Sequence, residues 1–181
     1  MNYVNFGTAG VKVSPIALGL GLRGQDDESA AQYLIEHAIA RGVNLIDCAN
    51  VYGPMDDRAN IGRSEVVLGR ALKGKRDDLI ITSKAASPIG PGPNDRGSSR
   101  VHLLREIDRS LKRLGTDYVD VYIVHAPDPT TRLEETMRAL DDIVRQGKAR
   151  YIGISNHSAW QICRAQWIAD RCREMGLATY V

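Results

Sequence analysis

The chain has 181 residues, of which 43% are hydrophobic and 25% charged, and its formal net charge is +2. This composition is typical of an ordinary globular domain, and basic residues interspersed among acidic ones argue against a nucleic-acid surface. No apolar run approaches the roughly 18 residues of a membrane span, and no signal peptide is visible. The three cysteines lack zinc-type spacing. We therefore expect a cytoplasmic protein without membrane or nucleic-acid partners.

Strand-like and helix-like segments alternate along almost the whole chain. Residues 4–7 and 11–15 flank a Thr-Ala-Gly turn and predict a short hairpin. Apolar runs then predict strands at 16–19, 43–47, 78–84, 118–125, 149–155 and 177–181. Apolar residues at helical spacing predict helices at 28–41, 64–74, 98–115, 132–148 and 158–176. This alternation predicts a parallel sheet with right-handed crossovers.

The spacing of the expected strand ends fits a (β/α)8 barrel. The ends fall near Gly19, Asp47, Lys84, His125, Ser155 and Val181, so that successive ends are 28, 37, 41, 30 and 26 residues apart. A TIM barrel of about 250 residues uses roughly 31 residues for each β/α unit. The sequence therefore predicts one incomplete domain over residues 1–181, a TIM barrel truncated after about the start of the sixth strand.

A G-x-G-x-x-G stretch at residues 19–24 raises the alternative of a Rossmann-type dinucleotide site. In that fold the pyrophosphate rests at the N-terminus of the following helix. Here that position carries Asp26, Asp27 and Glu28, which already complement the helix dipole and repel a phosphate. The stretch is better explained as the end of the first barrel strand.

Four side chains that can carry charge or protons stand at or just after consecutive strand ends, namely Asp47, Tyr52, Lys84 and His125. Each alone has a structural explanation, but the C-terminal rim of a barrel is where active sites form. A nearby ammonium stabilises a phenolate, so Lys84, held by Asp47, can make Tyr52 a better proton donor. His125 can orient a carbonyl, and Tyr52 is then the general acid while a cofactor supplies hydride.

The segments "NLIDCANVYG", "ITSK", "DYVDVYIVH" and "ARYIGISN", in this order, resemble the aldo-keto reductase family. The resemblance covers nearly the whole chain and implies an NADPH-dependent oxidoreductase that reduces aldehyde or ketone carbonyls to alcohols. By this resemblance Asp47, Tyr52, Lys84 and His125 match the catalytic tetrad, with Tyr52 as the proton donor. The N-terminal hairpin resembles the family's plug over the N-terminal end of the barrel.

The same resemblance implies NADP(H) as the cofactor. It assigns cofactor contacts to Gly19, Leu20, Gly21, Asp47, Ser155 and Asn156, with Ser155 and Asn156 at the nicotinamide carboxamide. The family's later β/α units, which clamp the phosphates, are not present in these residues. The sequence therefore leaves three alternatives open: a truncated fragment without cofactor binding or catalysis, a cofactor-sensing subunit like the family's potassium-channel β subunits, and a barrel completed by a second chain.

Several other side chains have expected structural positions. Trp160 and Trp167, seven residues apart on one expected helix, are predicted to pack against the sheet. His37 and His102 lie on expected helices and are predicted to face solvent. Cys48 adjoins Asp47 but has no assigned base, so no catalytic thiol is expected, and no cluster of ligands predicts a metal site.

Overall fold

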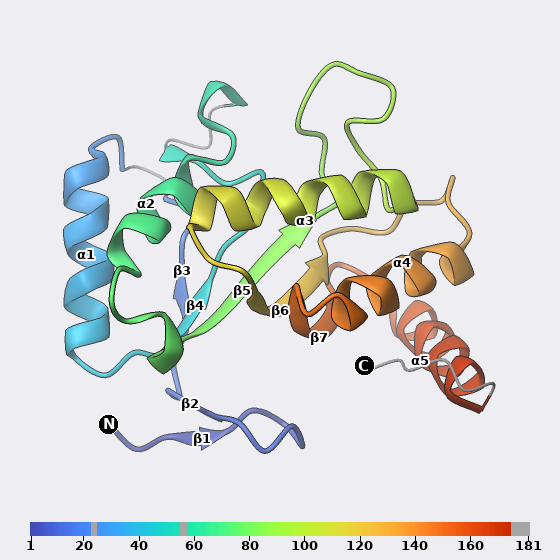
Figure 1. Ribbon diagram of the computed structural model, residues 1–181, viewed down its shortest axis with the longest axis horizontal. Coiled ribbons are helices and arrows are strands. Elements are labelled where there is room, and N and C mark those ends of the chain that lie inside the picture. Colours follow the sequence, from blue (N-terminus) through green and yellow to red (C-terminus); the bar gives the residue numbers. More distant parts are fainter. Residues whose placement is uncertain (23–24, 55–57, 175–181) are drawn as a thin grey trace.

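The computed structural model describes residues 1–22, 25–54 and 58–174. Its main sheet is parallel and has the strand order β3 (Leu18–Gly19), β4 (Leu45–Asp47), β5 (Ile80–Ala85), β6 (Val119–Val124) and β7 (Ala149–Ile154). A helix follows each strand: α1 (Glu28–Ala40), α2 (Arg63–Ala71), α3 (Arg100–Leu114), α4 (Leu133–Arg145) and α5 (Ala159–Glu174). Short 3₁₀ turns at Arg58–Asn60 and Arg76–Asp78 precede α2 and β5. The spatial order of the strands equals their chain order, as predicted for the first five strands of a TIM barrel (Figure 1).

The N-terminal hairpin lies at the end of the sheet where the strands begin (Figure 1). Its strands, β1 (Val4–Asn5) and β2 (Lys12–Val13), pair antiparallel. Asn44, directly before β4, fixes the hairpin, because its Oδ1 accepts from Ser14 N at 2.6 Å and its Nδ2 donates to Lys12 O at 3.0 Å. The predicted position of the hairpin at the N-terminal end of the strands is confirmed.

Helix α3 shows how the local sequence builds the outer layer. The Ser99 side chain caps its N-terminus by accepting from His102 N. Leu103 and Ile107, one turn apart, are fully buried in the core between helices and sheet. Gly115 ends the helix in the left-handed conformation, with φ 65°, which costs glycine little. The predicted boundaries at 98–115 are thus explained by a serine cap and a glycine stop.

The last described helix differs from the prediction. Trp160 and Trp167 are 64% and 56% exposed, so the expectation that they pack against the sheet is wrong. The residues of α5 that are buried are instead small or aliphatic, Ala165 and Ile168 among them. β3 and β7 are the two edges of the described sheet, which does not close into a barrel. Gly24 and the strand expected at 177–181 lie outside the described residues. Among the residues that are described, no helix is long and apolar enough to cross a membrane.

His102 is also not at the surface, although His37 is exposed as expected. The His102 ring is completely buried, and its Nδ1 lies 3.0 Å from Asn94 O. Asn94 belongs to the long segment after β5, which folds back over the first turn of α3. Arg105, one turn further along the helix, donates to the same carbonyl at 2.6 Å. The histidine therefore anchors this segment instead of facing solvent.

This burial predicts that the protein loses stability as the pH falls below about 6.5, the ordinary pKa of histidine. Burial is the largest influence on the pKa of His102 and lowers it, while the Asn94 carbonyl and the Glu106 carboxylate oppose the shift without reversing it. Between the lowered pKa and the ordinary one, the unfolded chain binds more protons than the folded protein, so the free energy of unfolding falls with decreasing pH. Urea unfolding across this window measures the loss.

The His102→Gln variant is the test of this origin. It should show a weaker loss of stability between about pH 7 and pH 5.5 than the unmodified protein, because one of the groups that bind the extra proton is gone. His37→Gln, at an exposed position, is the control for the loss of a histidine side chain as such. If the His102 variant kept the full pH dependence, other groups would have to account for it.

Candidate active site

The four predicted catalytic residues come from three adjacent strands and the loop after one of them, and they meet at the carboxyl ends of these strands. Asp47 is the last residue of β4, Lys84 lies one residue before the end of β5, and His125 directly follows β6. Tyr52 is on the loop after β4. In the parallel register Asp47 pairs with Thr82, so that Asp47, Thr82 and Lys84 project from the same face of the sheet.

Lys84 is the centre of the cluster. Its Nζ lies 2.6 Å from Asp47 Oδ2, 2.8 Å from the Cys48 carbonyl oxygen and 3.4 Å from the Tyr52 hydroxyl. The Lys84 side chain is 7% exposed, whereas that of Asp47 is 33% exposed. The ammonium is therefore buried with one carboxylate and one carbonyl to compensate its charge, and its third direction is toward the phenol.

His125 approaches the same phenol from the neighbouring strand. Its Nε2 lies 3.5 Å from the Tyr52 hydroxyl oxygen, and the two rings meet edge to face with centroids 5.5 Å apart. Burial, and then the Lys84 ammonium, lower the pKa of His125 below its ordinary value, while Asp47 raises it by less. The imidazole is consequently neutral at pH 7, with one nitrogen that donates and one that accepts.

Three polar residues that contact the cluster were not among the predicted site residues. Thr82 Oγ1 donates to Asp47 Oδ1 and so holds the carboxylate oxygen that Lys84 does not use. Ser87 Oγ lies 3.2 Å from His125 Nδ1. Asn50, fully buried, donates from Nδ2 to a carboxylate of α3 and from its backbone to Lys84 O at 3.0 Å. Only Thr82 carried a signal, since it lies two residues before Lys84 and must share its face.

The predicted carboxamide-binding pair follows β7, the next strand of the sheet. Asn156 has a left-handed backbone, with φ 59°. Its Nδ2 donates to His125 O at 2.7 Å and to Ser155 Oγ at 3.2 Å. These bonds leave Asn156 Oδ1 as an acceptor and the Ser155 hydroxyl hydrogen as a donor. That pair complements a carboxamide, which has one acceptor and donors of its own.

The predicted glycine contacts lie at the end of β3. Gly19 pairs with Asp47 in the sheet, and a Cβ added to Gly19 or Gly21 would meet no atom within 4 Å, so both face open space. Leu20 is completely buried in the hydrophobic core, its N–H donates to Asp47 O and its carbonyl accepts from Ser64 Oγ, both at 2.8 Å, so that none of this residue is exposed to a ligand. Asp27 Oδ1 accepts from Ser29 N at 2.8 Å and caps α1. The helix N-terminus that a Rossmann site needs for phosphate is therefore already occupied by a carboxylate.

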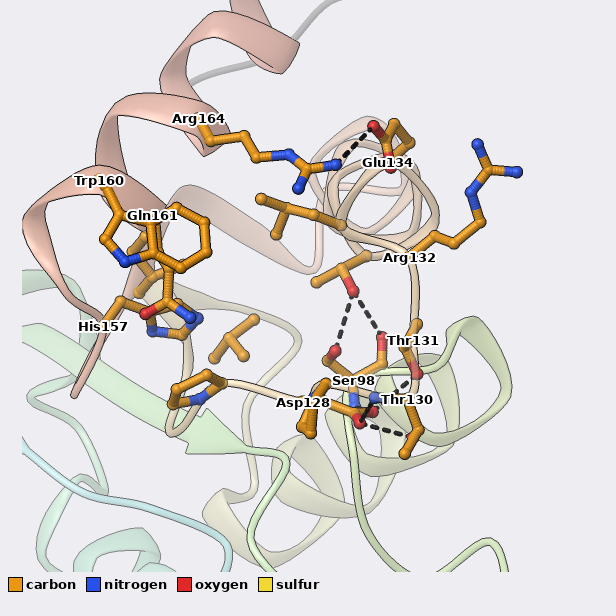
Figure 2. Close-up of a pocket in the computed structure, with 16 residues that line it drawn as sticks. Ser98, Asp128, Thr130, Thr131, Arg132, Glu134, His157, Trp160, Gln161 and Arg164 are labelled. Atoms are coloured by element: carbon orange, nitrogen blue, oxygen red, sulfur yellow. Dashed lines mark hydrogen bonds and ion pairs between the residues drawn. The ribbon is translucent and has the colours of Figure 1, made fainter.

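A separate hollow of about 540 Å³ lies between the loop that follows β6 and the first turns of α4 and α5 (Figure 2). Trp160 and His157 border it on one side and Arg132 on the other, and Arg164 and Glu134 form an ion pair of 3.4 Å at its border. None of the four clustered residues lines it. Among the described residues, no three histidine, cysteine, aspartate or glutamate side chains are grouped to hold a metal ion.

The sequence is similar to known proteins along nearly its whole length. The chain matches the model of the Aldo/keto reductase family over residues 7–180. It is 40% identical to a probable voltage-gated potassium channel subunit beta from Arabidopsis thaliana, over 97% of this chain and 53% of that protein. It is 37% identical to the aldo-keto reductase YhdN of Bacillus subtilis, over 90% of this chain and 49% of that protein.

A solved structure of an aldo-keto reductase has a similar fold. A thermostable aldo-keto reductase, crystallised with the inhibitor epalrestat, matches 93% of this chain and 58% of its own chain with a TM-score of 0.78 and 34% identity. The chain thus spans about half the length of the relatives it matches. Since the family model covers nearly all of its residues and the strand order is that of the same barrel, the chain belongs to the aldo/keto reductase family.

Proposed function

We propose that these residues form the catalytic part of an NADPH-dependent oxidoreductase that reduces aldehyde or ketone carbonyls to alcohols. The observation that carries the proposal is the convergence on one phenolic oxygen: Lys84 Nζ lies 3.4 Å and His125 Nε2 3.5 Å from the Tyr52 hydroxyl. The Lys84 ammonium donates to this oxygen and stabilises the phenolate that proton donation leaves behind, and His125 lies close enough to bind a carbonyl oxygen beside it. This is the arrangement that a general acid of this type requires.

The roles of the four residues follow from their contacts. Asp47 and the Cys48 carbonyl hold the Lys84 ammonium in place at 2.6 and 2.8 Å, so that its remaining proton faces Tyr52. Tyr52 donates its proton to the substrate carbonyl oxygen as the carbon is reduced. His125, neutral and partly buried, binds the same carbonyl oxygen and orients it toward the phenol.

NADP(H) is the proposed cofactor, and it supplies the hydride when bound. The donor and acceptor left free at Ser155 and Asn156 support this choice, because together they match a carboxamide. Gly19 and Gly21 support it too, because the open space beside them adjoins Asp47. We propose that these residues bind the cofactor and orient its nicotinamide at the carboxyl ends of the strands, next to His125.

The proposal is tested by following NADPH oxidation with an aromatic aldehyde, together with a titration of NADPH by fluorescence. We expect saturable NADPH binding and turnover that depends on the aldehyde. The Ser155→Ala variant should weaken NADPH binding by roughly 2–10-fold, the effect of one lost hydrogen bond. Ser29→Ala, at an exposed position on α1, serves as the control and should bind normally.

A second function is favoured by one observation, the 40% identity to a probable voltage-gated potassium channel subunit beta. In a cofactor-sensing subunit, NADPH would bind tightly and be turned over slowly. The complete set Asp47, Tyr52, Lys84 and His125 favours an enzyme. The titration separates the cases, since tight binding with negligible turnover supports the sensor, and no saturable binding leaves a fragment that neither binds cofactor nor catalyses.

A further inference from the structure

Ser87 contacts the proposed carbonyl-orienting histidine on the side away from the phenol. Its hydroxyl oxygen lies 3.2 Å from His125 Nδ1, while His125 Nε2 faces the Tyr52 hydroxyl at 3.5 Å. Each nitrogen of the imidazole ring therefore faces one hydroxyl group, Ser87 at Nδ1 and Tyr52 at Nε2. Which nitrogen carries the hydrogen depends on which of the two hydroxyl groups donates to it.

The backbone delivers Ser87 to this place by an unusual turn. Ala86, just past the end of β5, has φ 98° and is buried. A non-glycine residue in this region is strained and persists only where its surroundings hold it. Here the loop holds it, since Gly97 N donates to Ala86 O at 2.9 Å and Ile89 N donates to Asp95 O at 2.9 Å. The turn directs Ser87 toward β6 and His125 instead of continuing the strand.

Two tautomers of the neutral ring are chemically possible, and they differ in what Tyr52 can do. If Nδ1 carried the hydrogen, Nε2 would accept the Tyr52 proton, and that proton would be directed to the histidine and not to a substrate. If Ser87 donates to Nδ1, Nε2 carries the hydrogen and donates outward. Only the second arrangement leaves the phenolic proton available to a substrate, because the Lys84 ammonium and an Nε2–H are both donors and neither accepts that proton.

We propose that Ser87 is a positioning residue that holds His125 as the Nε2–H tautomer. The inference rests on the proposed function, because the tautomer matters only if Tyr52 donates a proton to a carbonyl. Ser87 acts through His125 and does not itself contact the reacting atoms. The turn at Ala86 places Ser87 against His125, and Ser87 in turn directs the Nε2–H of His125 into the site.

The test reads the tautomer directly by nitrogen-15 NMR of labelled histidines in the 181-residue chain, without cofactor or substrate. The His125 signals are assigned by their loss in His125→Gln. We expect Nε2 to be protonated and Nδ1 bare in the unmodified chain. Ser87→Ala should give a mixture of tautomers and Ser87→Thr, which keeps the hydroxyl, should restore the single form. Ser158→Ala, at an exposed serine, is the matched control.

Kinetics supply the second measurement. Ser87→Ala should lower kcat roughly 3–10-fold, as expected for one lost hydrogen bond, and Ser87→Thr should recover most of it. A protonated Nδ1 in the unmodified chain, or an unchanged tautomer in Ser87→Ala, would overturn the inference. If the tautomer behaves as expected but the chain shows no turnover, the proposed function fails and the positioning by Ser87 stands, so the two failures are distinguishable.

Discussion

Replacing Tyr52 with phenylalanine should lower the rate of aldehyde reduction by about 10²–10⁴-fold, the range that a general acid contributes. The substitution removes only the oxygen on which Lys84 and His125 converge, at 3.4 and 3.5 Å. The ring remains and keeps its edge-to-face contact with the imidazole. The rate is measured by NADPH oxidation at saturating aldehyde, so that a change in kcat is separated from a change in KM.

Two controls make this result interpretable. Tyr33→Phe, at a tyrosine that is 69% exposed on α1, should leave the rate unchanged. The Tyr52 variant should also unfold within about 1 kcal/mol of the unmodified chain, because the two hydrogen bonds lost are long and the ring still packs. A Tyr52→Phe protein with the full rate would show that another group donates the proton.

The convergence at Tyr52 could be expected from the sequence because strand ends are simple to locate. Asp47, Lys84 and His125 each end or follow an apolar run, and parallel strands place their carboxyl ends at one edge. The same reasoning predicted the strand order, whereas the position of the hairpin was implied by the resemblance to the aldo-keto reductase family. What the pattern did not give is the exact partner of each atom, and Ser87 shows why. Its approach to His125 depends on the φ of 98° at Ala86, and no residue type signals such a turn.

The wrong predictions have a common cause, which is that periodicity identifies a face but not its partner. Trp160 and Trp167 share a helical face, yet this face of α5 is exposed. His102 is polar and was expected outside, but the segment after β5 folds over it. In both cases burial is decided by a distant part of the chain. Charged residues are subject to the same uncertainty, and Glu65 of α2 is the strongest example, since it is completely buried.

Replacing Glu65 with alanine should lower the free energy of unfolding by about 3–5 kcal/mol, the cost of removing one member of a buried charge pair. Glu65 Oε2 accepts from Arg113 Nε at 2.6 Å, and Oε1 accepts from the Ser83 hydroxyl at 2.6 Å. The carboxylate thus joins α2 to the end of α3 and to the outer face of β5. Its loss leaves Arg113, which is 24% exposed, without its buried anion. Urea unfolding measures the change.

The effect should extend to the site because Ser83 lies between Thr82 and Lys84 on the same strand. Glu65→Gln keeps an acceptor for Ser83 and the packed volume, so it should cost less than the alanine variant. Glu28→Ala breaks the ion pairs of Glu28 with Arg63 and Arg70 at the surface, and about 1 kcal/mol or less is expected there. If Glu65→Ala destabilised no more than Glu28→Ala, the buried pair would not be what holds the helices against β5. Because a domain is stable by only about 5–15 kcal/mol, a loss of the expected size would leave little to hold Lys84 in place, and NADPH turnover should fall together with stability.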